Sequence, residues 1–564
     1  MRFLALIAIS ALTAAAQQNS LVAPQNPLPS VVNPDSAPTF PSKAFFRQGF
    51  GRELPKVEIK APIRLQEFVV DNHLELSLQK YLELVMANNP DIVIQRLSVE
   101  TFKNNITRQY SPFDPFFQSS FTATRSTTPT TTVLAGAAVQ SDLSQPFTSL
   151  YNQTLENGTN FSVGFNATKS STNSTFQTFN PSVSSGLIMR FSQPLLRNRG
   201  TAVNRLGIMV ARSRLRQGEY TLRDQLLRLV QTAELAYWQV IQARESLKVQ
   251  EANLNLNGEL LKRNQRELEL GAISALEIYQ PQANYASAEV RVTQARYTLQ
   301  QAEDALRRQF GADVDPDFRN MPIVLTENVA PPQDEKPLDK EQYVETAYRL
   351  RPDLKAQLQN LDMDDLSYRI AKNRLKPDVS LTGGYTANGR GGNFIPRDGT
   401  LDPVTNVQAV AVPGGLGDSL NQVFAFNFPT YFGGITVRLP LRDRASQADL
   451  ADAVLNKRLD TLRARSIEQN IRVDVLNAVT RVESSRAAVR QSQITVNFGQ
   501  QRLDAERKRY DLGVTTIFFV LDATQFLFTA QSDLVAQTVQ YRRDLLNLMR
   551  VTGTLLDDRS IVVD

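Results

Sequence analysis

Apolar residues return at every seventh position in two parts of this chain. The first series lies in 205–270, a stretch without proline, and comprises Leu226, Ala233, Val240, Leu247, Leu254, Leu261 and Leu268. The second comprises Leu527, Leu534, Tyr541 and Leu548. A sustained heptad predicts a left-handed coiled coil. We expect long helices over 205–270 and 444–512, with helices returning over 276–310 and 519–551. At 1.5 Å per residue, each long helix would measure about 100 Å.

Other segments alternate apolar and polar residues, as strands with one apolar face do. The apolar sets are Phe161, Val163 and Phe165; Val183, Leu187, Met189 and Phe191; Val379, Leu381 and Tyr385; and Ile435, Val437 and Leu439. A further strand is expected from Phe117. Such alternation suits strands that face lipid on one side, although each segment alone also fits a soluble sheet. The segment at Phe161 is expected to extend an extracellular hairpin. The Ser/Thr/Asn/Gly-rich stretches 126–160 and 388–421 are expected to be exposed loops.

The chain repeats its landmarks in the same order in two halves. The matching pairs are 76–92 with 341–354, each containing Pro-Asp; 186–200 with 433–445; and 267–282 with 509–524, which align Gly271 with Gly513. A duplicated unit explains this order most simply. Each unit would consist of a helix, a strand pair, a long helix, a glycine turn and a returning helix.

The amino end has the features of an export signal. Arg2 precedes an apolar run that ends in three alanines, which predicts cleavage after Ala16. We therefore expect a signal peptide at 1–16, an extended arm at 17–74, repeat one at 75–311, a linker at 312–340, repeat two at 341–553 and a C-terminal tail at 554–564.

Composition narrows the possible functions. The chain has no cysteine and one histidine, His73, which excludes cysteine nucleophiles, histidine-based triads and the usual zinc ligand sets. We expect no enzymatic activity, no catalytic site, no metal and no cofactor. The 62 Lys and Arg are interleaved with 57 Asp and Glu, so no concentrated basic face for nucleic acid is expected.

Barrel closure predicts several copies of the chain. Four principal strands cannot close a membrane barrel, which needs about eight or more. An open edge in lipid would leave backbone groups unpaired, at several kcal/mol each. Three copies would give about 12 strands, and their helices would form a hollow cylinder.

The order of these elements, the repetition and the segment "LGVTTIFFVLDAT" after Tyr510 resemble the TolC-type outer-membrane efflux proteins. The resemblance covers 76 to about 556 and implies an internally duplicated, mixed α and β fold. That fold is a trimeric outer-membrane β-barrel, continuous with a long periplasmic α-helical coiled-coil barrel. The implied function is the outer-membrane channel of a tripartite efflux or type I secretion system. Its partners would be a homotrimer, outer-membrane lipid, a periplasmic adaptor and an inner-membrane pump.

The resemblance also implies two kinds of site. The glycine turns would be adaptor-docking turns at the periplasmic end, built from Gly271, Ala272, Ser274, Gly513, Val514 and Thr515. The family's gate uses a tyrosine, an arginine and acidic residues at fixed positions from the glycine. Tyr510, Asp522 and Glu277 match that pattern, whereas Thr515 occupies the arginine position and Phe519 the first acidic position.

The departures from the family's pattern make an arginine-centred lock doubtful. We expect Phe518 and Phe519 to close the gate by apolar contact, although packing within the coiled coil explains both residues equally well. The candidate gate is therefore Tyr510, Phe519, Asp522 and Glu277. An exported soluble coiled-coil scaffold or adhesin is the alternative function. It would explain the heptads but not strands at matching places in both halves.

Overall fold

The computed structural model describes residues 63, 65–130, 137–174, 177–271, 273–327, 337–395 and 412–561. The chain divides into two units, 1–60 and 61–564, and every described residue belongs to the second. The predicted signal peptide and most of the predicted arm therefore lie outside the described residues.

The long helices form where the heptads predict them. In the first half, the helices are α2 (Leu78–Asn88), α3 (Pro90–Arg108), the short α4 (Thr201–Asn204), α5 (Leu206–Glu269) and α6 (Tyr279–Gln309). In the second half, they are α7 (Lys340–Leu350), α8 (Pro352–Arg374), α10 (Arg444–Asp511) and α11 (Ile517–Thr552). Proline opens both α3 and α8. It fits there because an N–H at the first helical position has no carbonyl partner within the helix, so its absence costs nothing.

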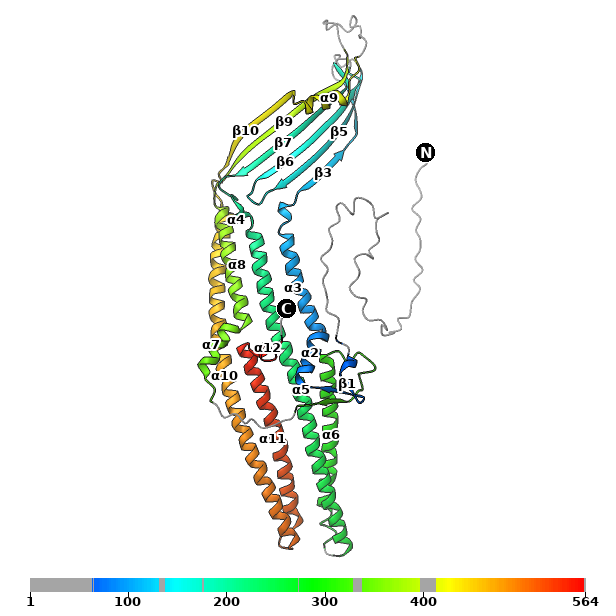
Figure 1. The fold of residues 1–564 in the computed structure, drawn as a ribbon, viewed down its shortest axis with the longest axis vertical. Helices are drawn as coiled ribbons and strands as arrows, with labels where there is room; N and C mark the ends of the chain where they lie inside the picture. Colours follow the sequence, from blue (N-terminus) through cyan, green and yellow to red (C-terminus); the bar gives the residue numbers. More distant parts are fainter. Residues whose placement is uncertain are drawn as a thin grey trace, which may run out of the picture. The chain divides into compact units, whose positions relative to one another are not determined.

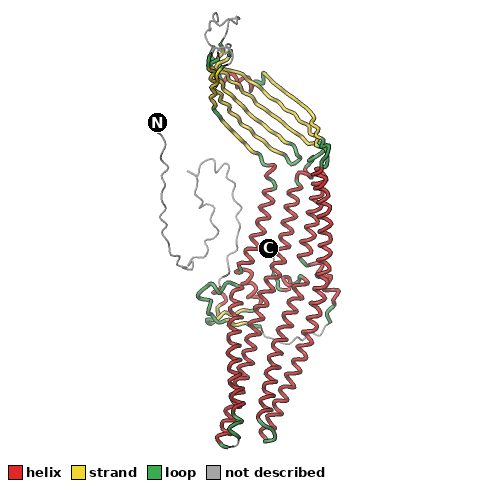
Figure 2. Tube along the Cα trace, turned by 180° about the vertical axis from the view of Figure 1, so that it is seen from behind, coloured by secondary structure: helices red, strands yellow, loops and turns green. Residues whose placement is uncertain are grey.

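The long helices lie side by side in one layer (Figures 1 and 2). Near the glycine turns the order of packing is α6, α5, α11, α10, and nearer the sheet it is α3, α5, α8, α10. The layer therefore has α3 and α6 at one edge and α10 at the other.

A seven-stranded antiparallel sheet continues from these helices. Its strands are β3 (Phe116–Phe121), β4 (Thr124–Pro129), β5 (Val139–Thr154), β6 (Asn160–Thr172), β7 (Phe179–Pro194), β9 (Asp378–Phe394) and β10 (Phe428–Arg438). The order is β10-β9-β7-β6-β5-β3, and β4 also pairs with β5. β3 and β4 share one register along β5. Between them, the Thr122 N–H donates to the Pro146 carbonyl, but Pro146 has no N–H to return a second bond, so the ladder is interrupted there. The sheet thus has six strand positions.

The predicted strand pair in the first half was wrong. β5 lies within 126–160, which we expected to be a loop, and β6 pairs along its length with both β5 and β7. The segment at Phe161 therefore belongs to the middle of the sheet. Polar residues on the second face of β5 and β6 obscured the strand pattern. The predicted loop 388–421 likewise contains the end of β9 and the helix α9 (Leu416–Phe424).

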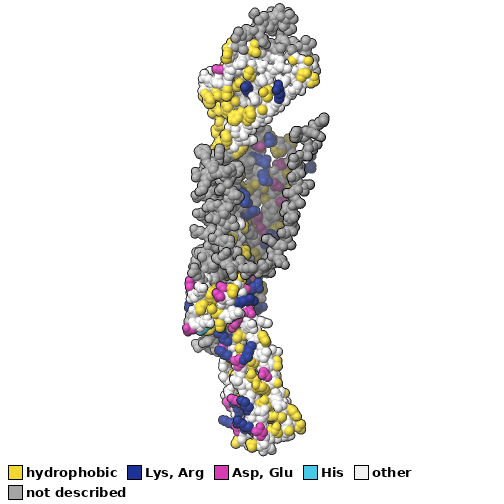
Figure 3. Space-filling model, turned by 90° about the vertical axis from the view of Figure 1, so that its right-hand side faces the viewer, with side chains coloured by type: hydrophobic (Ala, Val, Ile, Leu, Met, Phe, Trp, Pro, Cys, Tyr) yellow, Lys and Arg dark blue, Asp and Glu magenta, His cyan; other side chains and the backbone are white. Residues whose placement is uncertain are grey.

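The register gives the sheet two different faces. One row crosses all six strand positions and consists of Phe117, Tyr151, Val163, Met189, Tyr385 and Tyr431. A row on the opposite face consists of Ser120, Thr148, Asn166, Gly186, Asn388 and Phe428. Large apolar side chains on the first face are exposed, including Phe117, Tyr431 and Ile435. Figure 3 shows hydrophobic side chains gathered over this part of the chain.

Helix α9 covers part of the apolar face at the end of the sheet far from the long helices (Figure 1). Ser419 on α9 hydrogen-bonds Ser185 on β7. A Cβ atom at Gly389 would lie 2.0 Å from the Ser419 carbonyl oxygen, so glycine permits this close approach.

A second, three-stranded sheet lies beside the helices and contains β1 (Val69–Val70), β2 (His73–Leu76) and β8 (Ile323–Leu325). It follows a 3-10 turn at Leu65–Phe68; another, Ser111–Phe113, precedes β3. The end of the predicted arm and part of the predicted linker are thus paired strands. The predicted tail includes α12 (Leu555–Asp558), whose two leucines are fully buried in the core.

The main core lies in the middle of the helix layer. Its buried members include Leu74, Tyr81, Leu226, Tyr237 and Leu306. Among the described residues, no helix has both the length and the apolar character needed to cross a membrane.

Candidate functional site

The two glycine turns have the same backbone conformation. Gly271 has φ +69° and Gly513 has φ +70°, and each N–H donates to the carbonyl three residues before it. At the second turn, the Val514 N–H also donates to the Arg509 carbonyl at 2.9 Å, which completes a Schellman motif. No atom lies within 4 Å of a Cβ built at either glycine. The positive φ, not crowding, therefore explains the glycines.

Bare apolar side chains surround both turns. Leu270 is 83% exposed and Leu512, its counterpart, is 78% exposed. Leu276, Val514 and Phe518 are also exposed. Gathered apolar residues of this kind mark contact sites for other proteins.

The other predicted docking residues shape the turns. The Ser274 carbonyl accepts from the Glu277 N–H at 2.9 Å, and the Ser274 hydroxyl accepts from the Leu276 N–H at 3.3 Å. Thr515 is half-buried in the second turn. Ala272 lies outside the described residues.

Tyr510 connects the two hairpins. Its hydroxyl lies 2.6 Å from Glu267 Oε2, to which it donates, and 3.3 Å from Asn264 Oδ1. Tyr510 is on α10, and both acceptors are on α5. Partial burial, followed by the hydrogen bond to Glu267, raises the pKa of Tyr510. The phenol therefore remains a neutral donor at physiological pH.

An arginine lies at the centre of the same contact. Arg263 on α5 pairs with Asp511 at 2.7 Å and with Glu267 at 3.0 Å, and its guanidinium lies 4.8 Å from the centre of the Tyr510 ring. The hydrogen bond to Asp511, with a second to Glu267, raises the pKa of Arg263. We name Asn264, Arg263, Glu267, Tyr510 and Asp511 the tip network. An arginine-centred contact is therefore present, and the arginine comes from the first hairpin.

The remaining gate residues lie on α11 and in the first turn. Asp522 pairs with Arg502 of α10 at 2.6 Å. Phe519 is half-exposed and its ring meets Phe518 edge to face, with the centroids 5.6 Å apart. Glu277 is exposed, and its charge contributes to the raised pKa of Tyr510. Convergence of Phe519 and Asp522 between chains stays a prediction.

No sequence pattern predicted Arg263, Glu267, Asp511 or Arg502 as site residues. Buried asparagines in α5 offered the one usable signal. Asn253, Asn257 and Asn264 are buried on one side of the helix, where a coiled coil normally places apolar residues. Three asparagines in a heptad region indicate a polar seam, and the tip network lies at its end.

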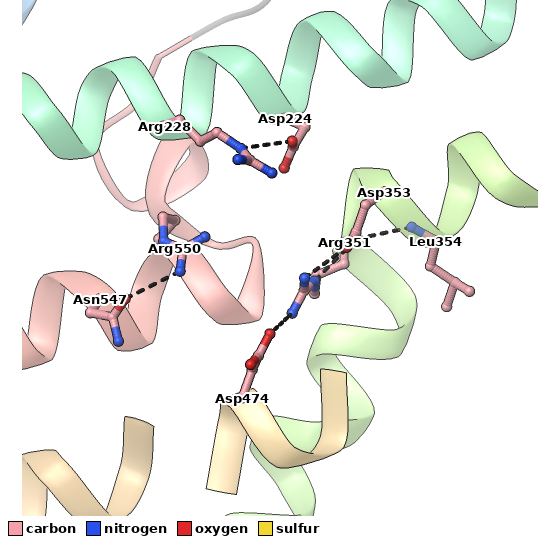
Figure 4. Close-up of polar contacts among 8 residues, drawn as sticks. All are labelled: Asp224, Arg228, Arg351, Asp353, Leu354, Asp474, Asn547 and Arg550. Carbon is pink, nitrogen blue, oxygen red and sulfur yellow. Dashed lines mark hydrogen bonds and ion pairs between the residues drawn. The ribbon is translucent and has the colours of Figure 1, made fainter. Parts of the chain in front are cut away.

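A second polar cluster joins the helices in the middle of the layer (Figure 4). Arg351, between α7 and α8, pairs with Asp353 at 2.7 Å and with Asp474 of α10 at 3.2 Å. Arg550 of α11 donates to Asn547, and burial, then the charges of Arg351 and Arg228, lower its pKa. This cluster holds the second hairpin against the short helices.

Comparison with known proteins identifies the family. The model of the family described as "Outer membrane efflux protein" matches residues 81–312 and 344–554, which is most of the chain. The chain belongs to the outer membrane efflux protein family. Both matched segments contain a long helix, a glycine turn and a returning helix. Membership places the protein in the outer membrane, from which it extends into the periplasm, and confirms the resemblance.

Individual proteins are also similar to this chain. The chain is 23% identical over 320 residues to the outer membrane protein TolC of Vibrio cholerae; the match covers 57% of this chain and 66% of that protein. A membrane protein from Pseudomonas aeruginosa has a similar fold, with a TM-score of 0.59 and 18% identity, over 90% of this chain and 99% of that one. The Campylobacter jejuni CmeC outer membrane channel gives a TM-score of 0.57 and 16% identity, over 90% and 91%.

Proposed function

We propose that this protein is the outer-membrane channel of a tripartite efflux or type I secretion system. It would act as a passive conduit for substrates that an inner-membrane pump expels through a periplasmic adaptor. The observation that carries this proposal is the pair of equivalent glycine turns, each surrounded by bare leucines at the end of a long helical hairpin. Family membership supports the channel role.

The channel would be a homotrimer. In the part of the chain that the structure describes, both edges of the helix layer carry large apolar residues that are at least half exposed. They include Tyr297 on α6 and Leu455, Leu459 and Leu462 on α10. Packing α10 of one copy against α3 and α6 of the next would bury them. The same arrangement would bring the edge strands β10 and β3 together, and the apolar face of the sheet would contact lipid.

The glycine turns would dock the adaptor. Three copies present six such turns, two from each chain, and the exposed Leu270 and Leu512 occupy equivalent places in them. An adaptor's helical hairpin could insert its tip between neighbouring turns. Gly271, Ser274, Gly513, Val514 and Thr515 shape this surface, and the proposal extends to Ala272.

The tip network would hold the resting gate. Tyr510 and Arg263 tie α10 to α5 within each chain, so the second hairpin cannot swing away from the first while these contacts remain. Phe519 and Asp522 would face the pore axis. Adaptor binding would open the channel by exchanging these contacts for intermolecular ones.

Charged substitutions at the turns test docking. Val514→Glu and Leu270→Glu place a carboxylate on an apolar contact surface and should abolish export of ethidium by cells that depend on this channel. The trimer in detergent should be retained. Asn255→Glu, at an exposed position in the body of α5, which lies in the middle of the layer, provides the matched control. Normal export by both turn variants would contradict docking at these turns.

A further inference from the structure

We propose that the β5–β6 hairpin forms part of the barrel wall, so that three copies close a barrel of eighteen strands. The proposal rests on the trimer put forward above. The supporting observation is the six-position sheet of each chain, in place of the four strands expected from the sequence. Three copies of four strands would give only twelve.

The side chains of the hairpin continue both faces of the sheet. On the apolar face, Tyr151 of β5 and Val163 of β6 lie between Phe117 and Met189 in one row. On the other face, Thr148 and Asn166 lie between Ser120 and Gly186. A hairpin folded away from the wall would not need this two-sided match. The pattern therefore indicates that β5 and β6 experience the same environments as their neighbours.

The hairpin ends in a turn that is fastened to the junction of sheet and helices. Glu156 in the turn forms an ion pair with Arg205 at the start of α5. The Gly200 N–H donates to the Asn157 carbonyl at 3.1 Å. Gly158 has φ +91°, and a Cβ there would lie 2.6 Å from the Asn198 carbonyl oxygen. The turn is thus packed closely against its own chain at the height where the neighbouring strands become helices.

The edges of the sheet suit closure by identical copies. β3 and β4 run away from the helices and β10 runs back toward them, so pairing β10 with the next copy's β3 continues the antiparallel order (Figure 1). Every residue of β3, β4 and β10 is exposed in the single chain. An even number of strands per chain preserves this polarity, so the hairpin adds two strands without disturbing closure.

The hairpin widens the barrel without adding helices. In each chain, four strand positions connect to helices, through α3, α5, α8 and α10, whereas β5 and β6 connect only to each other at this end. With strands about 4.8 Å apart and tilted by about 40°, eighteen strands give a backbone diameter of roughly 36 Å, against roughly 24 Å for twelve. The barrel would therefore be about 1.5-fold wider over an unchanged set of helices.

Disulfide cross-linking tests the arrangement, because the chain has no cysteine of its own. Thr436→Cys on β10 is combined in turn with Gln118→Cys, Ser120→Cys or Thr122→Cys on the β3 edge, all on the polar face. Oxidation should link chains into dimers and trimers on a denaturing gel for at least one pair. Each single variant is the matched control for chance cross-links. Absence of linked chains for all three pairs would overturn the proposal.

A second pair of variants tests whether the hairpin leaves the wall. Ser120→Cys with Ser184→Cys joins β3 to β7, which β5 and β6 keep apart, so no link should form. Thr148→Cys with Asn166→Cys, which lie opposite each other, should link within the chain. A link between positions 120 and 184 would show β3 paired directly with β7 and overturn the proposal.

Electron cryo-microscopy of the full chain in lipid nanodiscs gives the direct count. Eighteen strands around a threefold axis are expected. A threefold barrel of twelve strands would overturn the proposal of eighteen strands but would not contradict the proposed channel function. A different number of copies would overturn the trimer as well as the strand count. Failure of docking, in contrast, would leave the strand count unchanged.

Discussion

The two halves of helix α5 are buried in different ways. Near the middle of the layer, Leu226, Val230, Tyr237 and Val240 are buried in a continuous apolar core. Nearer the glycine turn, three asparagines are buried, and the one buried leucine, Leu260, belongs to a smaller apolar cluster with residues of α10 and α11. There, Asn257 donates to Asn253, and the leucines of the heptad, such as Leu254 and Leu261, are only half-buried.

This difference is expected to make the middle of the layer harder to separate than the tips. Separating an apolar core exposes carbon to water at about 25 cal/mol per Å². Breaking a hydrogen bond beside water costs only about 1 kcal/mol, because water replaces the lost partner. The middle of the layer, which has the larger apolar core, is therefore expected to hold together more firmly than the tips, where a smaller apolar cluster and the tip network join the two hairpins.

Truncation of the core should have the largest effect on stability. Leu226→Ala removes a fully buried side chain and should cost about 3 kcal/mol, which would lower the thermal midpoint in detergent clearly. Leu254→Ala is the matched control, with the same substitution in the same heptad at a half-buried position, and should cost less. Equal losses would show that the two halves of α5 are packed alike.

Breaking the tip network should have a large effect on conductance and a small one on stability. Arg263→Gln removes two ion pairs and the contact with the Tyr510 ring, so resting conductance in planar bilayers should rise several-fold. Tyr510→Phe should act in the same direction but less, since it removes only the hydroxyl contacts. Arg228→Gln, which breaks an ion pair within α5 itself, is the control and should leave conductance unchanged. A closed Arg263→Gln channel would place the resting constriction elsewhere.

Phe519 and Asp522 should affect different properties of the tip. Phe519→Ala opens space at the mouth and should raise resting conductance. Asp522→Asn removes a charge that Arg502 already neutralises in part within the chain, so the loss of cation preference should be modest. Arg502→Gln should shift selectivity the opposite way, toward cations, because it leaves the carboxylate unpaired. Reversal potentials in a salt gradient measure both shifts, and unchanged potentials in both variants would remove Asp522 from the pore.

The smallest expected effect is a change of stability with pH, caused by Asp364 of α8, which lies between the sheet and the middle of the layer. Burial, together with the nearby charges of Asp460 and Asp365, raises the pKa of Asp364 to about 6, against the opposing charge of Lys457. A raised carboxyl pKa favours the folded state while the group is protonated. This contribution is complete below the unfolded pKa near 4 and is lost as pH rises through 6.

Asp364→Asn should therefore raise the thermal midpoint at pH 7.5 and change it little at pH 4. Asp362→Asn, at an exposed carboxyl two residues earlier in α8, is the control and should not stabilise at pH 7.5. If Asp364→Asn and the unmodified protein had the same thermal midpoint at every pH, solvent would already screen the repulsion between Asp364 and Asp460.

The sequence by itself determined the long helices, the glycine turns and the order of elements. These features depend on local rules. A heptad pattern can be read without knowing what surrounds it, Pro-Asp opens a helix, and positive φ selects glycine at Gly271 and Gly513. Strands with strong alternation, such as those containing Met189 and Ile435, were also predictable. Tyr510, Asp522 and Glu277 came from the family's spacing rather than from any local pattern.

Only the tertiary structure decided the number of strands and the partners at the tip. The sequence of β5 is mostly polar on both faces, so it shows no clear alternation. Only the register with β6 shows that Tyr151 and Thr148 lie on opposite faces of a strand. Arg263 is distant in sequence from Asp511, and nothing near either residue indicates that they meet at 2.7 Å. Pairing between distant segments depends on how the whole layer packs, so a local pattern cannot contain it.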